Sequence, residues 1–149
     1  MAEIGFYHLT RATAQDVLPA LLGRTLSAGQ RAIILCGSEE RLAALDTALW
    51  QCQNPDWLPH GSAATGHAPQ QPIWLTLLDE DAPNGARFIF LIDGMSTAQL
   101  DKFDRVFDLF DGNDDAAVSA ARRRWVAAKD GGHTLSYWQQ GPQGWERKQ

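Results

Sequence analysis

Residues 114–129 hold the side chains best suited to binding chemistry, in a stretch without proline or glycine that predicts a helix. At ~100° per residue, four of these side chains share roughly a 60° wedge of the helix: Val118, Arg122, Trp125 and Lys129. Two cations therefore flank an aromatic ring. An arginine fork can bind a carboxylate while the ring receives an apolar side chain. The wedge could thus hold an anionic peptide at the border between core and water.

Three alanines lie to one side of this wedge and offer a small-residue face that can pack closely on a sheet: Ala117, Ala121 and Ala128. Arg123 points to solvent, well away from the wedge. The same spacing also fits a purely structural helix, in which Trp125 belongs to the core and the aliphatic stems of Arg122 and Lys129 lie along it. Spacing alone leaves both interpretations open.

A nucleotide site finds little support in the sequence. Gly37-Ser38 joins the apolar run 31–36 to a helical stretch, but neither GxGxxG nor GxxxxGK[ST] occurs. A single glycine at such a turn is explained by turn geometry. We expect no cofactor, and keep a degenerate nucleotide-binding enzyme that uses this turn as an alternative function.

Motifs for metal binding or catalysis are missing from the sequence as well. Four histidines are scattered without HxxxH or HExxH spacing: His8, His60, His67 and His133. The acidic run 79–81 is typical of a solvated turn, and Cys36 ends an apolar run, where a thiol packs as a small hydrophobe. No GxSxG elbow occurs. We therefore expect no metal and no intrinsic catalytic activity.

The composition indicates one globular domain, expected over residues 1–149. Hydrophobic residues make up 44% and charged residues 21%, which excludes wholesale disorder. No apolar run approaches the roughly 18 residues of a membrane span, and the first residues lack the pattern of a secretory signal. We expect a soluble, cytoplasmic protein without a membrane partner.

The net charge of −5 is distributed unevenly. Residues 1–100 carry 5 Lys/Arg against 10 Asp/Glu, whereas residues 121–149 carry 6 against 2, a local charge of +4. An acidic body repels phosphates, so we expect little direct binding of nucleic acid. The basic segment remains available for a small anion or an acidic peptide.

Strand and helix signals alternate along the chain. Apolar runs typical of strands occupy residues 4–9, 31–36, 73–78 and 87–92. Thr13 and Asp16 resemble a capping box that begins one helix, and Gly37-Ser38 precedes a second. The apolar stripe predicted for that second helix consists of Leu42, Leu45, Leu49 and Trp50.

The second half predicts a short helix over residues 99–104, while 105–110 fits either its continuation or a short strand. After the helix of 114–129, residues 135–139 predict an edge strand, and residues 139–149 a C-terminal tail. The predicted fold class is α/β: a single domain with a mainly parallel sheet flanked by helices, Rossmann-like but without a nucleotide-binding loop.

A series of short motifs occurs in a specific order and spacing: Phe6-Tyr7-His8-Leu9, Ala48-Leu49-Trp50, Trp57-Leu58-Pro59-His60-Gly61, the runs 73–78 and 87–92, Phe107-Asp108-Leu109-Phe110-Asp111, and Ala121-Arg122-Arg123-Arg124-Trp125 with Lys129 and Gly132. In this order, and over nearly its whole length, the chain resembles the chi subunit family of the bacterial DNA polymerase III clamp-loader complex.

The resemblance implies a non-catalytic replication adaptor with an α/β fold that lacks a nucleotide site. Members bind the acidic C-terminal tail of the single-stranded-DNA-binding protein, a run of aspartates that ends in Ile-Pro-Phe. They also bind the psi subunit, which tethers them to the clamp loader. An acidic body with one basic helix suits such a peptide partner.

Carried over to this sequence, the resemblance assigns the tail site to one helix. Arg122 matches the arginine that clasps the terminal carboxylate, and Trp125 matches an aromatic position that lines the pocket for the last Phe. Val118 and Val126 stand where members have lysines, and we expect Lys129 to compensate, with Arg123 contributing at longer reach. Asp111 stands where the family has an apolar pocket residue.

The resemblance places psi at a second segment. Trp57, with its neighbours Leu58 and Pro59, matches the aromatic residue that members offer to psi. Alternatively, Trp57 is an ordinary loop aromatic folded over the core, or it serves another protein such as a helicase.

A third function would be direct binding of single-stranded DNA through Trp125, Trp138 and Trp145 with the basic tail, by stacking and cation contacts. For this alternative we expect weak or no binding. No role is assigned to residues 138–149.

Overall fold

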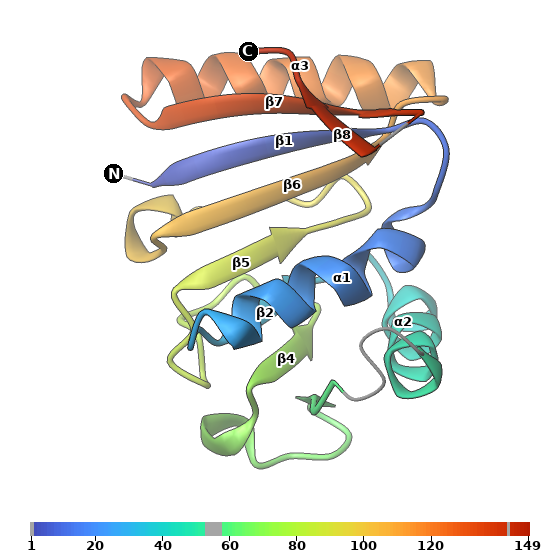
Figure 1. The fold of residues 1–149 in the computed structure, drawn as a ribbon. Helices are drawn as coiled ribbons and strands as arrows, with labels where there is room; N and C mark the ends of the chain where they lie inside the picture. The colour runs from blue at the N-terminus through green and yellow to red at the C-terminus, as the bar shows by residue number, and fades with distance from the viewer. Residues whose placement is uncertain (1, 53–57, 143) are drawn as a thin grey trace.

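Strands from both ends of the chain meet in one eight-stranded sheet (Figure 1). The computed structural model describes residues 2–52, 58–142 and 144–149. Across the sheet, the strands follow the order β3 (Gly61–Ser62), β4 (Ile73–Thr76), β2 (Ala32–Leu35), β5 (Phe88–Leu91), β6 (Arg105–Asp111), β1 (Glu3–Leu9), β7 (Thr134–Gly141) and β8 (Gly144–Arg147). All neighbours run parallel except β7 and β8. The predicted α/β fold class is therefore confirmed.

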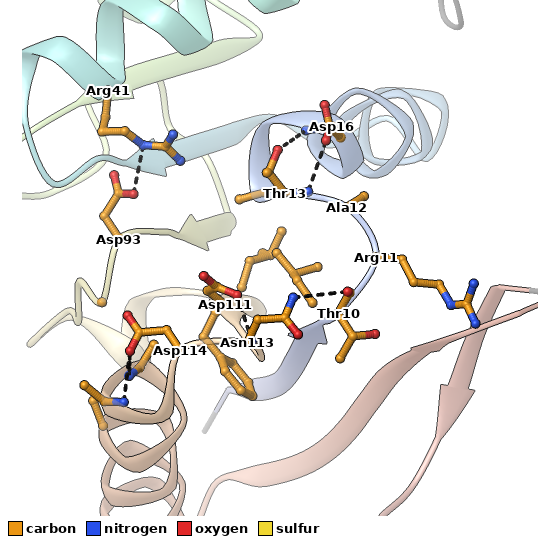
Figure 2. A pocket seen from close by; sticks show the side chains of 18 of the residues that line it. Thr10, Arg11, Ala12, Thr13, Asp16, Arg41, Asp93, Asp111, Asn113 and Asp114 are labelled. Carbon is orange, nitrogen blue, oxygen red and sulfur yellow. Dashed lines mark hydrogen bonds and ion pairs between the residues drawn. The ribbon is translucent and has the colours of Figure 1, made fainter.

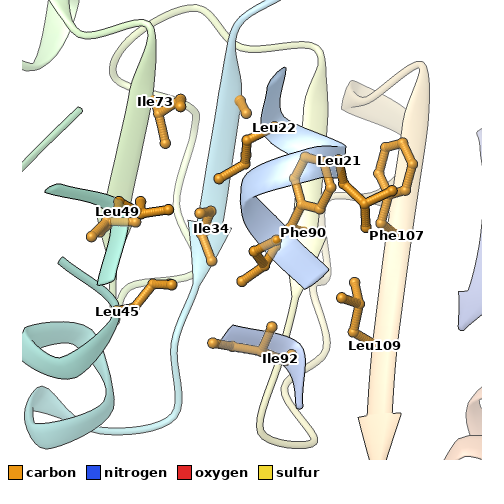
Figure 3. Packing of buried hydrophobic residues seen from close by; sticks show 14 of the residues in the cluster. Leu21, Leu22, Ile34, Leu45, Leu49, Ile73, Phe90, Ile92, Phe107 and Leu109 are labelled. Atoms are coloured by element: carbon orange, nitrogen blue, oxygen red, sulfur yellow. The ribbon is translucent and has the colours of Figure 1, made fainter. Parts of the chain in front are cut away.

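Helices cover both faces of the sheet. On one face, α1 (Ala14–Ser27) and α2 (Glu39–Gln51) pack over β2, β4, β5 and β6. Figure 3 shows this layer, with Leu21 and Leu22 of α1 beside Phe90 and Phe107 of the sheet. On the other face, α3 (Asp115–Asp130) packs against β1, β6 and β7. Two short 3₁₀ helices, η1 (Ala68–Gln70) and η2 (Leu100–Lys102), lie in connections.

Local capping begins α1 and α2 where the sequence predicts it. The Thr13 hydroxyl accepts a hydrogen bond from the Asp16 amide (3.3 Å), and the Asp16 carboxylate accepts one from the Thr13 amide (3.1 Å). Ser38 caps α2 in a similar way by accepting a hydrogen bond from the Arg41 amide. These bonds satisfy amides that have no partner within the helix.

The predicted apolar stripe of α2 is wrong at one residue. Leu45 and Leu49 are buried and Leu42 is partly buried, but Trp50 is 55% exposed. At about 100° per residue, Trp50 follows Leu49 away from the core side of the helix.

Two expectations for the second half of the chain are resolved by pairing. Residues 105–111 form strand β6 between β5 and β1, and the short helix before it is confined to η2. The predicted edge strand is not at the edge, because β8 pairs antiparallel with β7 on its outer side. Within the stretch expected as a tail, residues 139–141 complete β7 and residues 144–147 form β8.

In the described part of the chain, no helix combines the length and apolar character needed to cross a membrane.

Candidate functional site

The basic helix α3 lies close to the sheet because small residues form its inner side. Ala121 and Ala128 are buried against the sheet, as the alanine spacing predicts. The Asp114 carboxylate caps the helix by accepting a hydrogen bond from the Ala116 amide (3.0 Å), and the helix ends at Gly131. This placement brings the longer side chains of α3 to the border between core and water.

Three consecutive arginines on α3 have different surroundings. The guanidinium of Arg124 turns toward the sheet and donates two hydrogen bonds to the Asp108 carboxylate (2.6 and 3.0 Å). The side chains of Arg124 and Asp108 are only 16% and 4% exposed, respectively. Burial raises the pKa of Asp108, and the hydrogen bond from Arg124 opposes this rise. Arg124 is therefore held inside the protein and is not part of the free surface charge.

Arg122 and Arg123 are exposed, and neither has an acidic partner among the residues that the structure describes. The positive charge of Arg122 acts to lower the pKa of the Tyr137 hydroxyl on β7. Of the two arginines, Arg122 therefore lies on the side of α3 that faces β7. Lys129 is exposed one turn beyond Trp125. Arg122 and Lys129 are thus free to pair with an anion.

Trp125 belongs partly to the core and partly to the surface. Its ring meets Phe6 of β1 edge-on (centroids 5.3 Å apart) and Tyr137 of β7 edge-on (6.0 Å). These contacts fix the ring in place, while the residue remains partly exposed. Val118, two turns earlier, packs against the same hydrophobic cluster, and Val126 is 56% exposed. Trp125 therefore packs on the core and is still accessible to a ligand, so the structural and the binding interpretations of this helix are compatible.

Tyr137 and His8 complete this face, and neither was predicted as a site residue. The Tyr137 hydroxyl lies 2.5 Å from Nδ1 of His8. Burial raises the pKa of Tyr137, and the positive charge of Arg122 opposes that rise. Alternation along the strand places Tyr137 on the side of Phe6, facing α3, which is the signal that could have found it.

A crevice of about 750 Å³ opens at the carboxyl ends of β1 and β6, between the N-termini of α1 and α3 (Figure 2). These two neighbouring strands are followed by helices on opposite faces of the sheet, which is where open α/β folds bind their ligands. Asp111 lies here, where its carboxylate accepts a hydrogen bond from the Asn113 amide (2.9 Å). It lines the crevice, at the opposite end of α3 from Lys129.

Carboxylates of the chain itself occupy the amide groups that would hold a phosphate in this crevice. Asp16 and Asp114 cap α1 and α3. At the start of α2, Asp93 accepts a hydrogen bond from the Gly37 amide (3.0 Å) and from Arg41 (2.9 Å). An anion entering the crevice would meet negative charge instead of free amides. This arrangement argues against the nucleotide-binding alternative.

A second candidate surface lies at the C-terminal end of α2. Trp57, predicted to meet psi, lies outside the described residues. Leu58 is 1% exposed and packs in the core of the α1/α2 face, so it anchors the segment, and Pro59 is partly exposed. The exposed ring of Trp50 packs over the buried ring of His60, with centroids 4.2 Å apart.

The ring of His60 fixes this corner to α2. Its Nδ1 lies 2.7 Å from the carbonyl oxygen of Leu58, and its Nε2 lies 2.9 Å from the Asp46 carboxylate. The segment around Pro59 is therefore tied to the helix that presents Trp50.

The three tryptophans suggested for direct DNA binding do not share a surface. Trp138 and Trp145 contact Tyr7, at centroid distances of 6.2 and 5.1 Å. Trp125 instead contacts Phe6, which points to the opposite face of the sheet. Because the sheet separates them, these residues cannot form one stacking platform.

Fold and site together define a class: a doubly wound α/β domain whose switch-point crevice is capped by its own carboxylates and whose free arginines lie on an outer helix. A family model described as DNA polymerase III chi subunit, HolC, matches residues 1–136, and the chain belongs to this family. Among curated proteins, no sequence matches the chain significantly.

Membership in this family gives the chain a role associated with DNA replication, in a family of accessory subunits of the polymerase III holoenzyme. The match ends within β7, so the end of β7 and the whole of β8 lie outside it.

Proposed function

We propose that the exposed face of α3 binds the acidic C-terminal tail of the single-stranded-DNA-binding protein, and that the chain links this tail to the clamp loader through psi. The observation that carries the proposal is the difference between Arg122 and Arg124. Arg124 is paired with a buried carboxylate, whereas Arg122 is exposed beside a half-buried indole. The family, a group of replication accessory subunits, supports the same function.

Arg122 would pair with the terminal carboxylate of the tail through its planar fork. Trp125 offers the edge of a fixed ring to the last Phe, with Val126 and Val118 as apolar neighbours. Lys129, and Arg123 at longer reach, would contact the aspartates that precede it. A hydrogen bond to a charged group contributes about 1.5–3 kcal/mol, so Arg122 would dominate the affinity.

The psi subunit would bind the opposite end of the sheet, at Pro59 and the exposed ring of Trp50, while Trp57 stays the candidate that the sequence alone gives for this partner. Five strand spacings separate β4 from β7 in the sheet order, which at about 4.8 Å each amounts to about 24 Å. The two proposed surfaces would thus not overlap, which allows both partners to be bound at once. The chain acts in this proposal as an adaptor, with no catalytic step of its own.

The test is a titration of a labelled Asp-Asp-Asp-Ile-Pro-Phe peptide into the full chain, followed by fluorescence anisotropy. Arg122→Ala should weaken binding by about tenfold or more, because it removes the charge-assisted pair. Arg24→Ala is the matched control, since it removes the same charge from an exposed position in the last turn of α1, on the other face of the sheet. Equal affinities of Arg122→Ala and the wild-type chain would move the site elsewhere, and no binding by the wild-type chain would end the proposal.

A further inference from the structure

The strand β8 lies outside the matched family region and beside the proposed peptide site. It pairs with β7 at one edge of the sheet, and α3 covers one face of the sheet next to this edge (Figure 1). Its register places Arg147 opposite Trp138 and Glu146 opposite Gln139. Since side chains alternate along a strand, β8 presents two different sets of residues to the two faces.

Contacts confirm how these sets divide. Trp145 reaches the ring of Tyr7 and Arg147 lies over Trp138, at 5.8 Å from the ring centroid. Both residues therefore belong to the face away from α3. Glu146 lies on the other side of β8, and Lys148, the residue after the strand, joins it through an ion pair of 3.1 Å between the two side chains. This is the side of β8 that faces α3.

Tyr137 connects Lys148 to the site on α3. The amide of Lys148 donates a hydrogen bond to the Tyr137 carbonyl (2.7 Å). The ring of the same tyrosine contacts Trp125, and its hydroxyl is within electrostatic range of Arg122. Neighbouring strands are about 4.8 Å apart and a peptide advances about 3.3 Å per residue. A few residues of bound peptide would thus span from Arg122 to Lys148.

We propose that Lys148, the residue directly after β8, forms the second wall of the peptide site, opposite α3, and pairs with the aspartates of the bound tail. The inference rests on the proposed function of α3. Its support is charge complementarity: α3 offers Arg122 and Lys129 to the ligand, with Arg123 at longer reach, and Lys148 adds a further cation from across Tyr137. The exposed carboxylate of Glu146, 51% accessible, holds Lys148 in the free protein and would be displaced by a peptide aspartate.

Lys148 and Arg147 are neighbouring cations on opposite faces of the sheet, and replacing each in turn gives a matched test. Binding of the labelled peptide to the full chain is followed by fluorescence anisotropy. Lys148→Ala should weaken binding about two- to fivefold, as expected for a partly exposed charge pair. Arg147→Ala removes the same charge from the neighbouring residue, the last of β8, but from the far face, and should leave affinity unchanged. Glu146→Gln removes the competing carboxylate and should strengthen binding about twofold. Equal effects of Lys148→Ala and Arg147→Ala would overturn the inference.

Chemical cross-linking tests the contact directly. The chain has three lysines, Lys102, Lys129 and Lys148, and Lys102 pairs with Asp81 in a different part of the fold. With the unmodified peptide already bound, a water-soluble carbodiimide should couple peptide aspartates as amides to Lys148 and Lys129 but not to Lys102. Coupling to Lys129 without Lys148 would overturn the inference while leaving the α3 site intact. A peptide that does not bind the wild-type chain would instead refute the proposed function itself.

Discussion

The two ends of the sheet present unlike surfaces to a partner. At the β7 end, free cations surround a half-buried indole, with Arg122 and Lys129 on α3. At the β4 end, the exposed surface is an aromatic ring, Trp50, next to Pro59, and the one histidine beneath it is tied to Asp46. Under the proposed function, the partner at the first end brings negative charge and the partner at the second brings apolar surface. Each end should therefore respond to different variables.

The largest expected effect separates a structural arginine from a binding arginine within the first end. Arg124→Ala leaves the Asp108 carboxylate buried without its partner, which should cost about 3–5 kcal/mol of the free energy of unfolding. Arg122→Ala, two residues earlier and exposed, should change stability by less than about 0.5 kcal/mol. Urea unfolding of both variants measures the difference. A double variant, Arg124→Leu with Asp108→Asn, should recover much of the loss because no buried charge remains.

The pH dependence of this variant follows from Asp108. Burial raises the folded-state pKa of Asp108 above 3.8, so its contribution to stability is complete below that pH and is lost as pH rises through the raised pKa. Removing Arg124 removes the hydrogen bond that lowers this pKa. Arg124→Ala should thus approach the wild-type stability near about pH 4 and fall behind it toward neutral pH. An equal deficit at both pH values would contradict this account of Asp108.

The next effect concerns the second end. Trp50→Ala should weaken binding of the psi subunit by about 30-fold, in the range expected for a tryptophan at the centre of an interface. Binding of the acidic peptide should be unaffected, since Trp50 lies at the far end of the sheet. Leu78→Ala is the control. Leu78 is also a large exposed hydrophobic residue (62% exposed), but it follows the carboxyl end of β4, whereas Trp50 lies in the last turn of α2. Calorimetric titration with psi gives both affinities, and an equal loss in the two variants would reject the Trp50 surface.

Added salt should weaken peptide binding at one end of the sheet more than psi binding at the other. Raising ionic strength from about 0.1 M to about 1 M shortens the Debye length from about 10 Å to about 3 Å. Peptide affinity at α3 should fall by about tenfold over this range, because the pairs there are partly exposed. Psi affinity should change less than about twofold, since apolar burial is not screened by salt. Flat peptide affinity would contradict charge pairing at Arg122.

The smallest expected effect is the coupling between the ends. A saturating peptide should alter psi affinity by less than about twofold. The reason is that the peptide surface on α3 and β7 and the psi surface at the end of α2 share no helix or strand. Titrating psi with and without the peptide measures this coupling. A larger change in either direction would mean that the sheet transmits binding, and that the two ends are not independent.

The features predicted correctly from sequence are those that depend on close neighbours. The capping box of Thr13 and Asp16 spans four residues and appears as expected. The border position of Trp125 follows from the periodicity of a single helix. Residues 105–110 were ambiguous because their pattern suits both elements, and pairing with β1, about 100 residues away in sequence, decides for a strand.

The features that were missed depend on contacts between distant residues. The three arginines of α3 are alike in sequence, and only the position of Asp108 on β6 shows that Arg124 is buried. Trp50 continues an apolar pattern, but α2 turns it outward at its last turn. Strand β8 has four residues after a glycine- and proline-containing turn, which is too short a pattern to predict a strand.

The presence of β8 has a consequence for self-association. An eight-residue strand such as β7, with tyrosine and tryptophan at its centre, would expose a row of unpaired backbone groups and could template aggregation if it ended the sheet. β8 covers that row and is itself a poor template, because it is short, follows Pro142 closely and carries Glu146 and Arg147. The opposite border is the two-residue β3. Neither border of the described sheet thus offers a long strand edge to a second molecule.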